Sequence, residues 1–365
     1  MTANYRHPDF KALSLESAPE CRFEQAPKDA TLPDAFMSTT NFPTYVHVGG
    51  SWRMPEMHRM DSHLVWDPKL SRLVTKEFSR IRKGDLVACA TAEDGTEGVL
   101  VWSHGFEDPH AKAGAADAFA FMATEVSREK PVNYEALYAE FLKNRGAQGR
   151  ILWVIGPALV HARGREAMEW LVHNGFCHCL FAGNAVGVHD VEAALYGSTL
   201  GMKADGSGAA HGHAYHMRAI NEVKKAGSIE ALVRQGKLKS GIMHALTVTK
   251  TPYVLAGSIR DDGPLPETIP DTLQSQGAMR EHTNQATMVV MVATALHSIA
   301  TGNMLPTFCK RPSGELAEIT TICVDQEEFT VNKLKDRGTH QAYGVVTNAQ
   351  DFMRLVHLEL KARIS

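Results

Sequence analysis

Short apolar runs that alternate with helix-like stretches dominate the second half of the chain. Each run has seven or eight residues, many of them β-branched or aromatic, as expected for strands buried on both faces of a sheet. The six runs are RILWVIG (150–156), FCHCLFAG (176–183), TPYVLAGS (251–258), TMVVMVA (287–293), ITTICVD (319–325) and AYGVVTN (342–348). Alternation of this kind predicts an α/β fold with a doubly wound, mostly parallel sheet and right-handed crossovers.

The first third of the chain lacks this alternation of apolar runs and helix-like stretches. Residues 1–30 are polar and aperiodic and are expected to form an N-terminal arm, whereas residues 31–115 carry alternating segments and glycine turns that predict a small β-rich domain. The α/β domain is expected over residues 116–365, with a first helix around residues 116–126. Residues 184–250 are too many for one crossover, so several helices are expected there.

Composition excludes several classes of protein. The 365 residues include 44% hydrophobic and 22% charged residues, and the net charge of -3 gives no sign of a nucleic-acid or anionic-membrane partner. No apolar stretch is long enough to span a bilayer, and the first residues lack the apolar core of a signal peptide, which favours a cytoplasmic location. Six scattered cysteines do not indicate a disulfide scaffold. Cys177 and Cys179 could be half of a metal site, but no second pair with zinc spacing follows, and a buried strand explains them better.

Ligands of open α/β sheets bind beyond the carboxyl ends of the strands, so the residues after each apolar run are the candidates for a site. The turn Gly183–Asn184–Ala185 precedes a helix and suits a pyrophosphate, because backbone N–H groups and the helix dipole both favour an anion there. An ordinary strand–helix turn is the alternative. The G-x-G-x-x-G fingerprint of the usual dinucleotide turn is absent.

Asp325 closes the fifth apolar run. An acidic residue at this place commonly accepts the ribose hydroxyls of a dinucleotide, and its charge would repel a 2′-phosphate, which favours NAD over NADP. The alternative is a cap for the following helix, EEFTVNKLK (327–335).

A charged loop, Arg260–Asp261–Asp262, follows the third run. It could bind an amino group or the nicotinamide ribose, or transfer protons, and the alternative is a salt-bridged loop. Lys239 could bind a substrate carboxylate or transfer a proton, although an exposed lysine on a helix face would look the same.

Histidines gather in one segment, GAAHGHAYH (208–216). Three of them, His211, His213 and His216, are close enough to suggest a metal site, but no carboxylate or cysteine completes a ligand set nearby. A substrate lid or a helix start is therefore expected, and no metal. His297 is expected to be a core or helix-face histidine.

Taken together, these segments resemble the archaeal-type ornithine cyclodeaminase family, also called LOR/SDH-region proteins, whose module forms the C-terminal part of cyanobacterial arginine dihydrolase/ornithine cyclodeaminases. The similarity runs from residue 31 to about 360. The matching segments are STTNFPTYVHV (38–48), FMATEVSREKP (121–131), GPALVH (156–161), AGNAVGVHDVEAALYGSTLGM (182–202), INEVKKAGSI (220–229), KSGIM (239–243), PYVLAGSIRDDGPLPE (252–267), LHSIATGNMLP (296–306), TICVD (321–325) and KDRGTHQAYG (335–344).

The resemblance implies a deoxyhypusine-synthase-like NAD-binding fold. It also implies cofactor contacts at Asn184, Ala185, Asp262, Asn303, Met304, Leu305, Asp325 and Asp336. Two departures stand out: the archaeal relatives carry an additional N-terminal domain, and the wording of the histidine segment differs from theirs.

The activity that the resemblance implies is NAD-dependent conversion of L-ornithine to L-proline and ammonia. A hydride leaves the α-carbon for NAD, the δ-amine closes the ring, ammonia departs and the hydride returns, so there is no net redox change. Asp261, Lys239 and His213 are the candidates for proton transfer or substrate anchoring. A homo-oligomer, specifically a tetramer, is also implied.

Three alternatives stay open at this point. The first is a dehydrogenase or imine reductase that acts on another amino acid and releases NADH. The second is a cyclase for a different diamino or guanidino acid. The third is a non-catalytic regulator that binds NAD.

Overall fold

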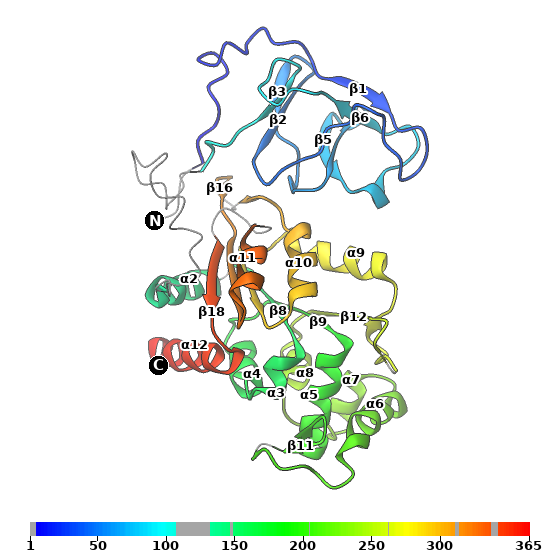
Figure 1. The fold of residues 1–365 in the computed structure, drawn as a ribbon, viewed down its shortest axis with the longest axis vertical. Coiled ribbons are helices and arrows are strands. Elements are labelled where there is room, and N and C mark those ends of the chain that lie inside the picture. The colour runs from blue at the N-terminus through cyan, green and yellow to red at the C-terminus, as the bar shows by residue number, and fades with distance from the viewer. Residues whose placement is uncertain are drawn as a thin grey trace. The chain divides into compact units, whose positions relative to one another are not determined.

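The computed structural model describes residues 5–106, 132–146, 149–203, 205–261, 263–310, 314–336 and 342–365 (Figure 1). The chain divides into two compact units. Unit 1 comprises Met1–Tyr134 and Pro306–Glu318, and unit 2 comprises Glu135–Leu305 and Ile319–Ser365. The helix expected around residues 116–126 lies outside the described residues.

Unit 1 is built from small antiparallel sheets. One has the strand order β1-β6-β4-β5, another has the order β3-β2-β7, and β15 and β16 form a hairpin. The strands are β1 (Arg22–Gln25), β2 (Thr44–Val48), β3 (Ser51–Arg53), β4 (His63–Asp67), β5 (Arg72–Lys76), β6 (Leu86–Cys89), β7 (Val99–Val101), β15 (Cys309–Lys310) and β16 (Leu316–Ala317). A short 3-10 helix, η1, covers Phe78–Arg80. Alternate residues such as Val46, Leu64 and Ala88 point inward and form the core.

Two segments join unit 1 from outside the range predicted for a β-rich domain. Strand β1 lies within the expected arm and pairs with β6, and Phe23 packs against the core. The segment Pro306–Glu318 contributes Phe308 and Leu316, which form an apolar cluster with Phe106. The sequence placed β1 in the N-terminal arm and Pro306–Glu318 in the α/β domain. Both segments are short, and a local sequence pattern does not reveal packing against distant residues.

Unit 2 contains the predicted parallel sheet. Its strands are β8 (Ile151–Ile155), β9 (Cys179–Gly183), β12 (Tyr253–Ala256), β13 (Thr268–Ile269), β14 (Met288–Val292), β17 (Thr320–Asp325) and β18 (Ala342–Val346). All six neighbouring pairs are parallel, in the order β13-β12-β9-β8-β14-β17-β18. The chain therefore builds outward from β8 in one direction and then resumes on its other side with β14. This reversal between β8 and β14 is the topological switch point at which doubly wound sheets bind ligands.

Helices cover both faces of this sheet (Figure 1). Helices α3 to α8 and α12 pack with one another on one face, and α9, α10 and α11 lie on the other. The helices are α2 (Tyr134–Arg145), α3 (Pro157–His161), α4 (Arg165–His173), α5 (Asn184–Tyr196), α6 (Tyr215–Ala226), α7 (Ile229–Arg234), α8 (Ile242–Thr249), α9 (Thr272–Thr283), α10 (Ala295–Met304), α11 (Glu328–Asp336) and α12 (Ala349–Ile364).

Residues 184–250 hold several helices, as expected. They form α5 to α8, together with the short strands β10 (Ser198–Thr199) and β11 (Met202–Lys203) and the 3-10 helix η2 (Gly212–Ala214). The strands β8 and β14 at the centre of the sheet are buried along their whole length. The sheet is thus a rigid base from which the loops at its carboxyl edge project.

Candidate functional site

Three helices begin directly after central strands at the carboxyl edge of the sheet, which we call the carboxyl rim. They are α3 after β8, α5 after β9 and α10 after β14, and their N-cap residues Gly156, Gly183 and Thr294 make no side-chain capping hydrogen bond. Elsewhere in unit 2, α7, α9 and α12 are capped by the side chains of Ser228, Asp271 and Asn348, whereas α4 and α6 also lack a side-chain cap. The uncapped starts of α5 and α10 offer backbone N–H groups to an anion such as a pyrophosphate, whereas the five-residue α3 begins with Pro157, which has no N–H.

The rim is closely packed at two glycines. A Cβ atom on Gly156 would collide with the carbonyl oxygen of Ala293, which itself has a positive φ of 54°. A Cβ atom on Gly183 would lie 3.0 Å from Cε1 of His297. The glycines therefore allow the Ala293 carbonyl and the His297 ring to pack against the main chain at these two strand ends.

Asn184 lies at this rim, as predicted, but its side-chain oxygen is hydrogen-bonded within the protein. Its Oδ1 atom accepts hydrogen bonds from the backbone N–H of Leu265 and from Oγ1 of Thr268, both at 2.9 Å, and the residue is only 4% exposed. The carbonyl oxygen therefore fixes the loop that leads to β13. The backbone of Asn184 and of Ala185 remains in the first turn of α5.

Asp325 ends β17 at the rim, Asp261 lies in the loop after β12, and both are partly buried. Asp325 Oδ1 accepts from the backbone N–H of Glu327 at 3.1 Å, directly before α11 begins at Glu328. Asp261 Oδ2 accepts from the backbone N–H of Ser258 at 2.7 Å, which closes the loop after β12. Among the described residues neither Asp261 nor the exposed Arg260 forms an ion pair, and Asp262 lies outside them.

Other predicted cofactor positions lie away from the rim. Asn303, Met304 and Leu305 end α10, which begins at the rim and is ten residues long, so they lie about 15 Å along the helix from its start. Met304 and Leu305 are each 3% exposed, and Oγ1 of Thr283 donates to the Met304 carbonyl at 3.1 Å. Asp336 ends α11 in the same manner, and its side chain is outside the described part. The structure brings Asn184 and Asp325 to one edge, but not these four residues.

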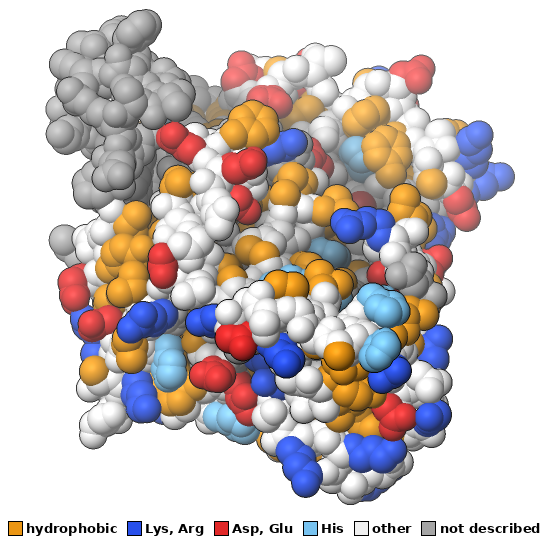
Figure 2. Space-filling view, turned by 60° about the horizontal axis from the view of Figure 1, so that its bottom comes forward, with side chains coloured by type: hydrophobic (Ala, Val, Ile, Leu, Met, Phe, Trp, Pro, Cys, Tyr) orange, Lys and Arg blue, Asp and Glu red, His pale blue; other side chains and the backbone are white. Residues whose placement is uncertain are grey.

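Lys239 and His213 are both exposed, on the helical face formed by α5 to α8. His213 lies in η2 and Lys239 precedes α8. Basic, acidic and histidine side chains are interspersed over the surface seen in Figure 2.

Within the described ranges no group of three or more His, Cys, Asp or Glu side chains could hold a metal ion. In the same ranges no helix is long and apolar enough to cross a membrane.

A buried carboxylate, which the sequence did not single out, holds the segment that carries Lys239. Asp190 on α5 is fully buried; Oδ1 accepts from Nε of Arg165 at 2.7 Å and from the N–H of Ile242 at 3.0 Å, and Oδ2 accepts from the N–H of Met243 at 2.7 Å. Burial raises the pKa of Asp190, and the Arg165 guanidinium opposes that rise. In the sequence, an aspartate among the apolar residues of α5 was the sign that could have revealed this buried carboxylate.

Gly241 is the residue that allows this arrangement. Its φ is +105°, and an added Cβ atom would collide with the guanidinium of Arg165. Arg165 Nη2 also donates to Ser240 Oγ at 3.3 Å. The KSGIM segment (239–243) is therefore held by both Asp190 and Arg165.

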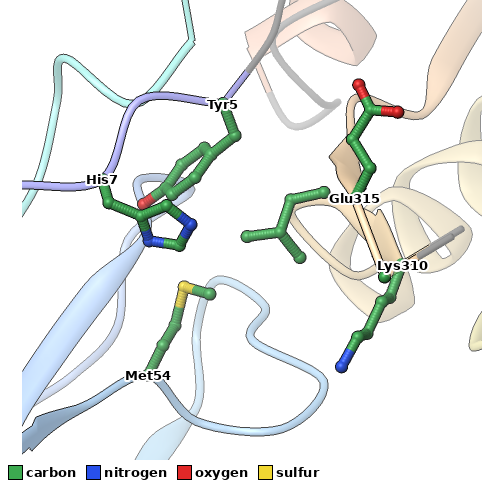
Figure 3. A pocket seen from close by; sticks show the side chains of 7 residues that line it. Tyr5, His7, Met54, Lys310 and Glu315 are labelled. Atoms are coloured by element: carbon green, nitrogen blue, oxygen red, sulfur yellow. The ribbon is translucent and has the colours of Figure 1, made fainter.

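Unit 1 contains a cavity of about 470 Å³ within its own residues (Figure 3). Tyr5, His7 and Met54 line one side, and Lys310 and Glu315 line the other. The hydroxyl of Tyr45 lies 2.9 Å from the Tyr5 hydroxyl and 3.1 Å from Nδ1 of His7. Burial raises the pKa of Tyr5, so this hydroxyl stays protonated.

Comparisons with known proteins agree with this architecture. A family model described as "Arginine dihydrolase ArgZ-like, C-terminal, Rossmann fold" matches residues 135–356, and one described as "Arginine dihydrolase ArgZ-like, C-terminal, first region" matches residues 43–135. The boundary between them coincides with the start of unit 2. The chain is therefore of the class in which a β-rich region precedes a Rossmann-fold domain.

Individual relatives narrow this class. Ornithine cyclodeaminase of Methanothermobacter thermautotrophicus is 42% identical over 95% of this chain and 80% of its own. The bifunctional arginine dihydrolase/ornithine cyclodeaminase AgrE of Nostoc sp. is 33% identical over 96% of this chain, which spans 48% of that protein. The chain belongs to the archaeal-type ornithine cyclodeaminase family, as the resemblance predicted.

Solved structures extend the comparison to the fold. The crystal structure of a putative LOR/SDH protein from Methanococcus maripaludis S2 aligns with a TM-score of 0.83 at 38% identity, over 95% of this chain and all of that one. A ternary complex of AgrE with ornithine and NAD+ aligns with a TM-score of 0.59 at 30% identity, over 95% of this chain and 47% of that one.

Proposed function

We propose that this protein is an NAD-dependent cyclodeaminase that converts L-ornithine to L-proline and ammonia. The observation that carries the proposal is the similarity, along nearly the whole chain, to proteins named ornithine cyclodeaminase. One structural neighbour was crystallised with ornithine and NAD+ together, which supports the same cofactor and substrate class here.

The carboxyl rim is where we propose that NAD binds. The backbone N–H groups of Asn184 and Ala185, at the uncapped start of α5, would hold the pyrophosphate. The Asp325 carboxylate would accept from the ribose hydroxyls, since its Oδ2 atom makes no hydrogen bond with the described residues. The buried side chains of Met304 and Leu305 have no part in this proposal, and Asn303, Asp262 and Asp336 stay predictions.

NAD, when bound, supplies a temporary acceptor for the α-hydride of the substrate. The chain's own residues would hold the amino acid so that its δ-nitrogen lies close to the α-carbon. Because the two groups belong to one molecule, the attack of the δ-nitrogen on the α-carbon is favoured. We assign Asp261 to the substrate amine and Lys239 to the substrate carboxylate. His213, which is exposed in η2, stays a candidate for proton transfer.

The test is incubation of the purified protein with L-ornithine, with and without added NAD+, while ammonia, proline and the absorbance of NADH are followed together. Equal amounts of ammonia and proline with no net NADH would support the proposal. Accumulation of NADH without proline would indicate a dehydrogenase instead, and NAD binding without turnover of L-ornithine, L-lysine or L-arginine would indicate a regulator. The expected homo-oligomer, a tetramer, stays a prediction that light scattering of the same preparation tests.

A further inference from the structure

His297 occupies a central place at the carboxyl rim. It lies in the first turn of α10, where its Nδ1 atom is 3.4 Å from Oγ1 of Thr294. On the other side its ring lies against Gly183, where a Cβ atom would be only 3.0 Å from the ring carbon Cε1. The missing side chain at position 183 therefore makes room for the imidazole beside the start of α5.

The surroundings of His297 keep its ring neutral. Partial burial lowers its pKa below the ordinary value for histidine, and the negative charge of Asp261 offsets part of that effect. The turn from β9 to α5 contributes the uncharged Gly183 and Asn184, and α10 contributes Thr294. Among the described residues, Asp261 is thus the charged group that acts on this ring. A neutral imidazole at neutral pH can accept a proton.

One nitrogen of the ring is available for that purpose. Nδ1 faces Thr294, whereas Nε2 makes no hydrogen bond with the described residues. Four other described histidines of unit 2 have lowered pKa values. His178 and His282 lie at the opposite, amino end of the sheet, His357 lies in α12, and His161 ends α3 with its ring 4.8 Å from that of His189. His178 Nδ1 already accepts from the N–H of Ile151 at 3.0 Å. His297 thus combines a place in the first turn of a rim helix with a ring nitrogen that makes no hydrogen bond with the described residues.

We propose that His297 is the proton-transfer residue of the reaction, an inference that rests on the proposed function. Nε2 accepts the proton that the attacking ammonium group must lose before its lone pair can form the new C–N bond. The resulting imidazolium donates that proton to the amino group that is to depart. Nε2 then takes the second proton from the new ring nitrogen, whose lone pair expels ammonia as the old C–N bond breaks, and this proton leaves with the ammonia as ammonium. The imidazole ends the cycle neutral, and no electrons pass through it.

The principal test compares His297→Gln and His297→Ala with the matched variant His282→Gln at the amino end of the sheet. General acid–base catalysis is worth roughly 10²–10⁴-fold, so we expect ammonia release from L-ornithine to fall at least about 100-fold in both His297 variants. We expect wild-type activity to fall at low pH as His297 becomes protonated, and this fall should be absent from the residual rate of both His297 variants. The dissociation constant of NAD should stay within about threefold, and His282→Gln should behave like the wild type.

A second readout does not depend on turnover. Hydrogen–deuterium exchange at the imidazole Cε1 atom, followed by mass spectrometry, gives the pKa of individual histidines. Because the Asp261 carboxylate raises the pKa of His297, Asp261→Asn should lower it further while leaving that of His282 unchanged. An unchanged His297 pKa would contradict the electrostatic part of the inference.

The remaining outcomes separate this inference from the proposed function. If the wild type releases ammonia from ornithine and His297→Gln does so at the same rate and with the same pH profile, the role of His297 is overturned while the proposed function stands. NAD binding that weakens in proportion to activity would reduce His297 to a residue that positions the cofactor, which also overturns it. A wild type that releases no ammonia from ornithine would overturn both.

Discussion

The helix starts of unit 2 fall into two kinds. Those of α3, α5 and α10, at the carboxyl rim, follow N-caps that lack a side-chain hydrogen bond. The start of α8 is closed by Asp190, whose two oxygens accept from the first two N–H groups of the helix, and α12 is closed by its cap Asn348. The closed starts belong to helices that support the fold, whereas the starts at the switch point are open and a ligand can bind there. Helices α4 and α6 also lack a side-chain cap, so an open start alone does not define the ligand site.

The largest effect should come from opening a closed start. Asp190→Ala removes the partner of Arg165 and the acceptor of two buried N–H groups, so we expect the free energy of unfolding to fall by about 3–5 kcal/mol. Urea unfolding without NAD measures it. The exposed pair Arg363–Glu135 is the control, since Glu135→Ala should cost no more than about 1 kcal/mol. Similar losses in the two variants would contradict the assigned role of Asp190.

Filling the open starts should stabilise the protein. At a concentration of 100 times its dissociation constant, NAD should raise the free energy of unfolding by about 2.7 kcal/mol, because it binds the folded chain alone. A thermal unfolding series in increasing NAD measures the gain. NADP at the same concentrations should give less, because its 2′-phosphate meets Asp325. No shift with either nucleotide would argue against a cofactor site at the rim.

A single methyl group at an open start should weaken cofactor binding. Gly183→Ala places a Cβ atom against the ring of His297, so we expect the dissociation constant of NAD to rise about tenfold, equivalent to about 1.4 kcal/mol. Calorimetric titration measures it. Gly277→Ala is the control: it lies within α9, where a Cβ atom meets nothing within 4 Å, and it should leave NAD binding unchanged and slightly stabilise the helix. Equal affinities in the two variants would contradict the prediction.

The smallest effect concerns a closed start away from the switch point. Asn348→Ala removes the hydrogen bond of 2.8 Å from the Asp351 N–H to Oδ1, which should lower the free energy of unfolding by about 1 kcal/mol. Chemical unfolding measures the loss, and a titration with NAD should give the wild-type affinity. A weakened affinity would mean that the two kinds of helix start are not functionally distinct.

The strands were predictable because fully buried strands leave an uninterrupted apolar run in the sequence. The edge strand β13 was missed, since Thr268 and Ile269 alone carry no such signal. The rim positions of Asn184 and Asp325 followed from one rule about strand ends, but the hydrogen bonds from Leu265 and Thr268 that occupy the Asn184 side chain depend on tertiary contacts. His297 was expected to be an ordinary helix-face histidine because its neighbour Gly183 is distant in sequence.

The segment that returns to unit 1 has a consequence for biosynthesis. Phe308 and Leu316 pack with Phe106, so this cluster cannot assemble until the hairpin β15–β16 leaves the ribosome. By then the strands β8, β9, β12 and β14 have already been made. The unit that is translated first is therefore completed only after most of the second has emerged, and no single cut separates the two into intact halves.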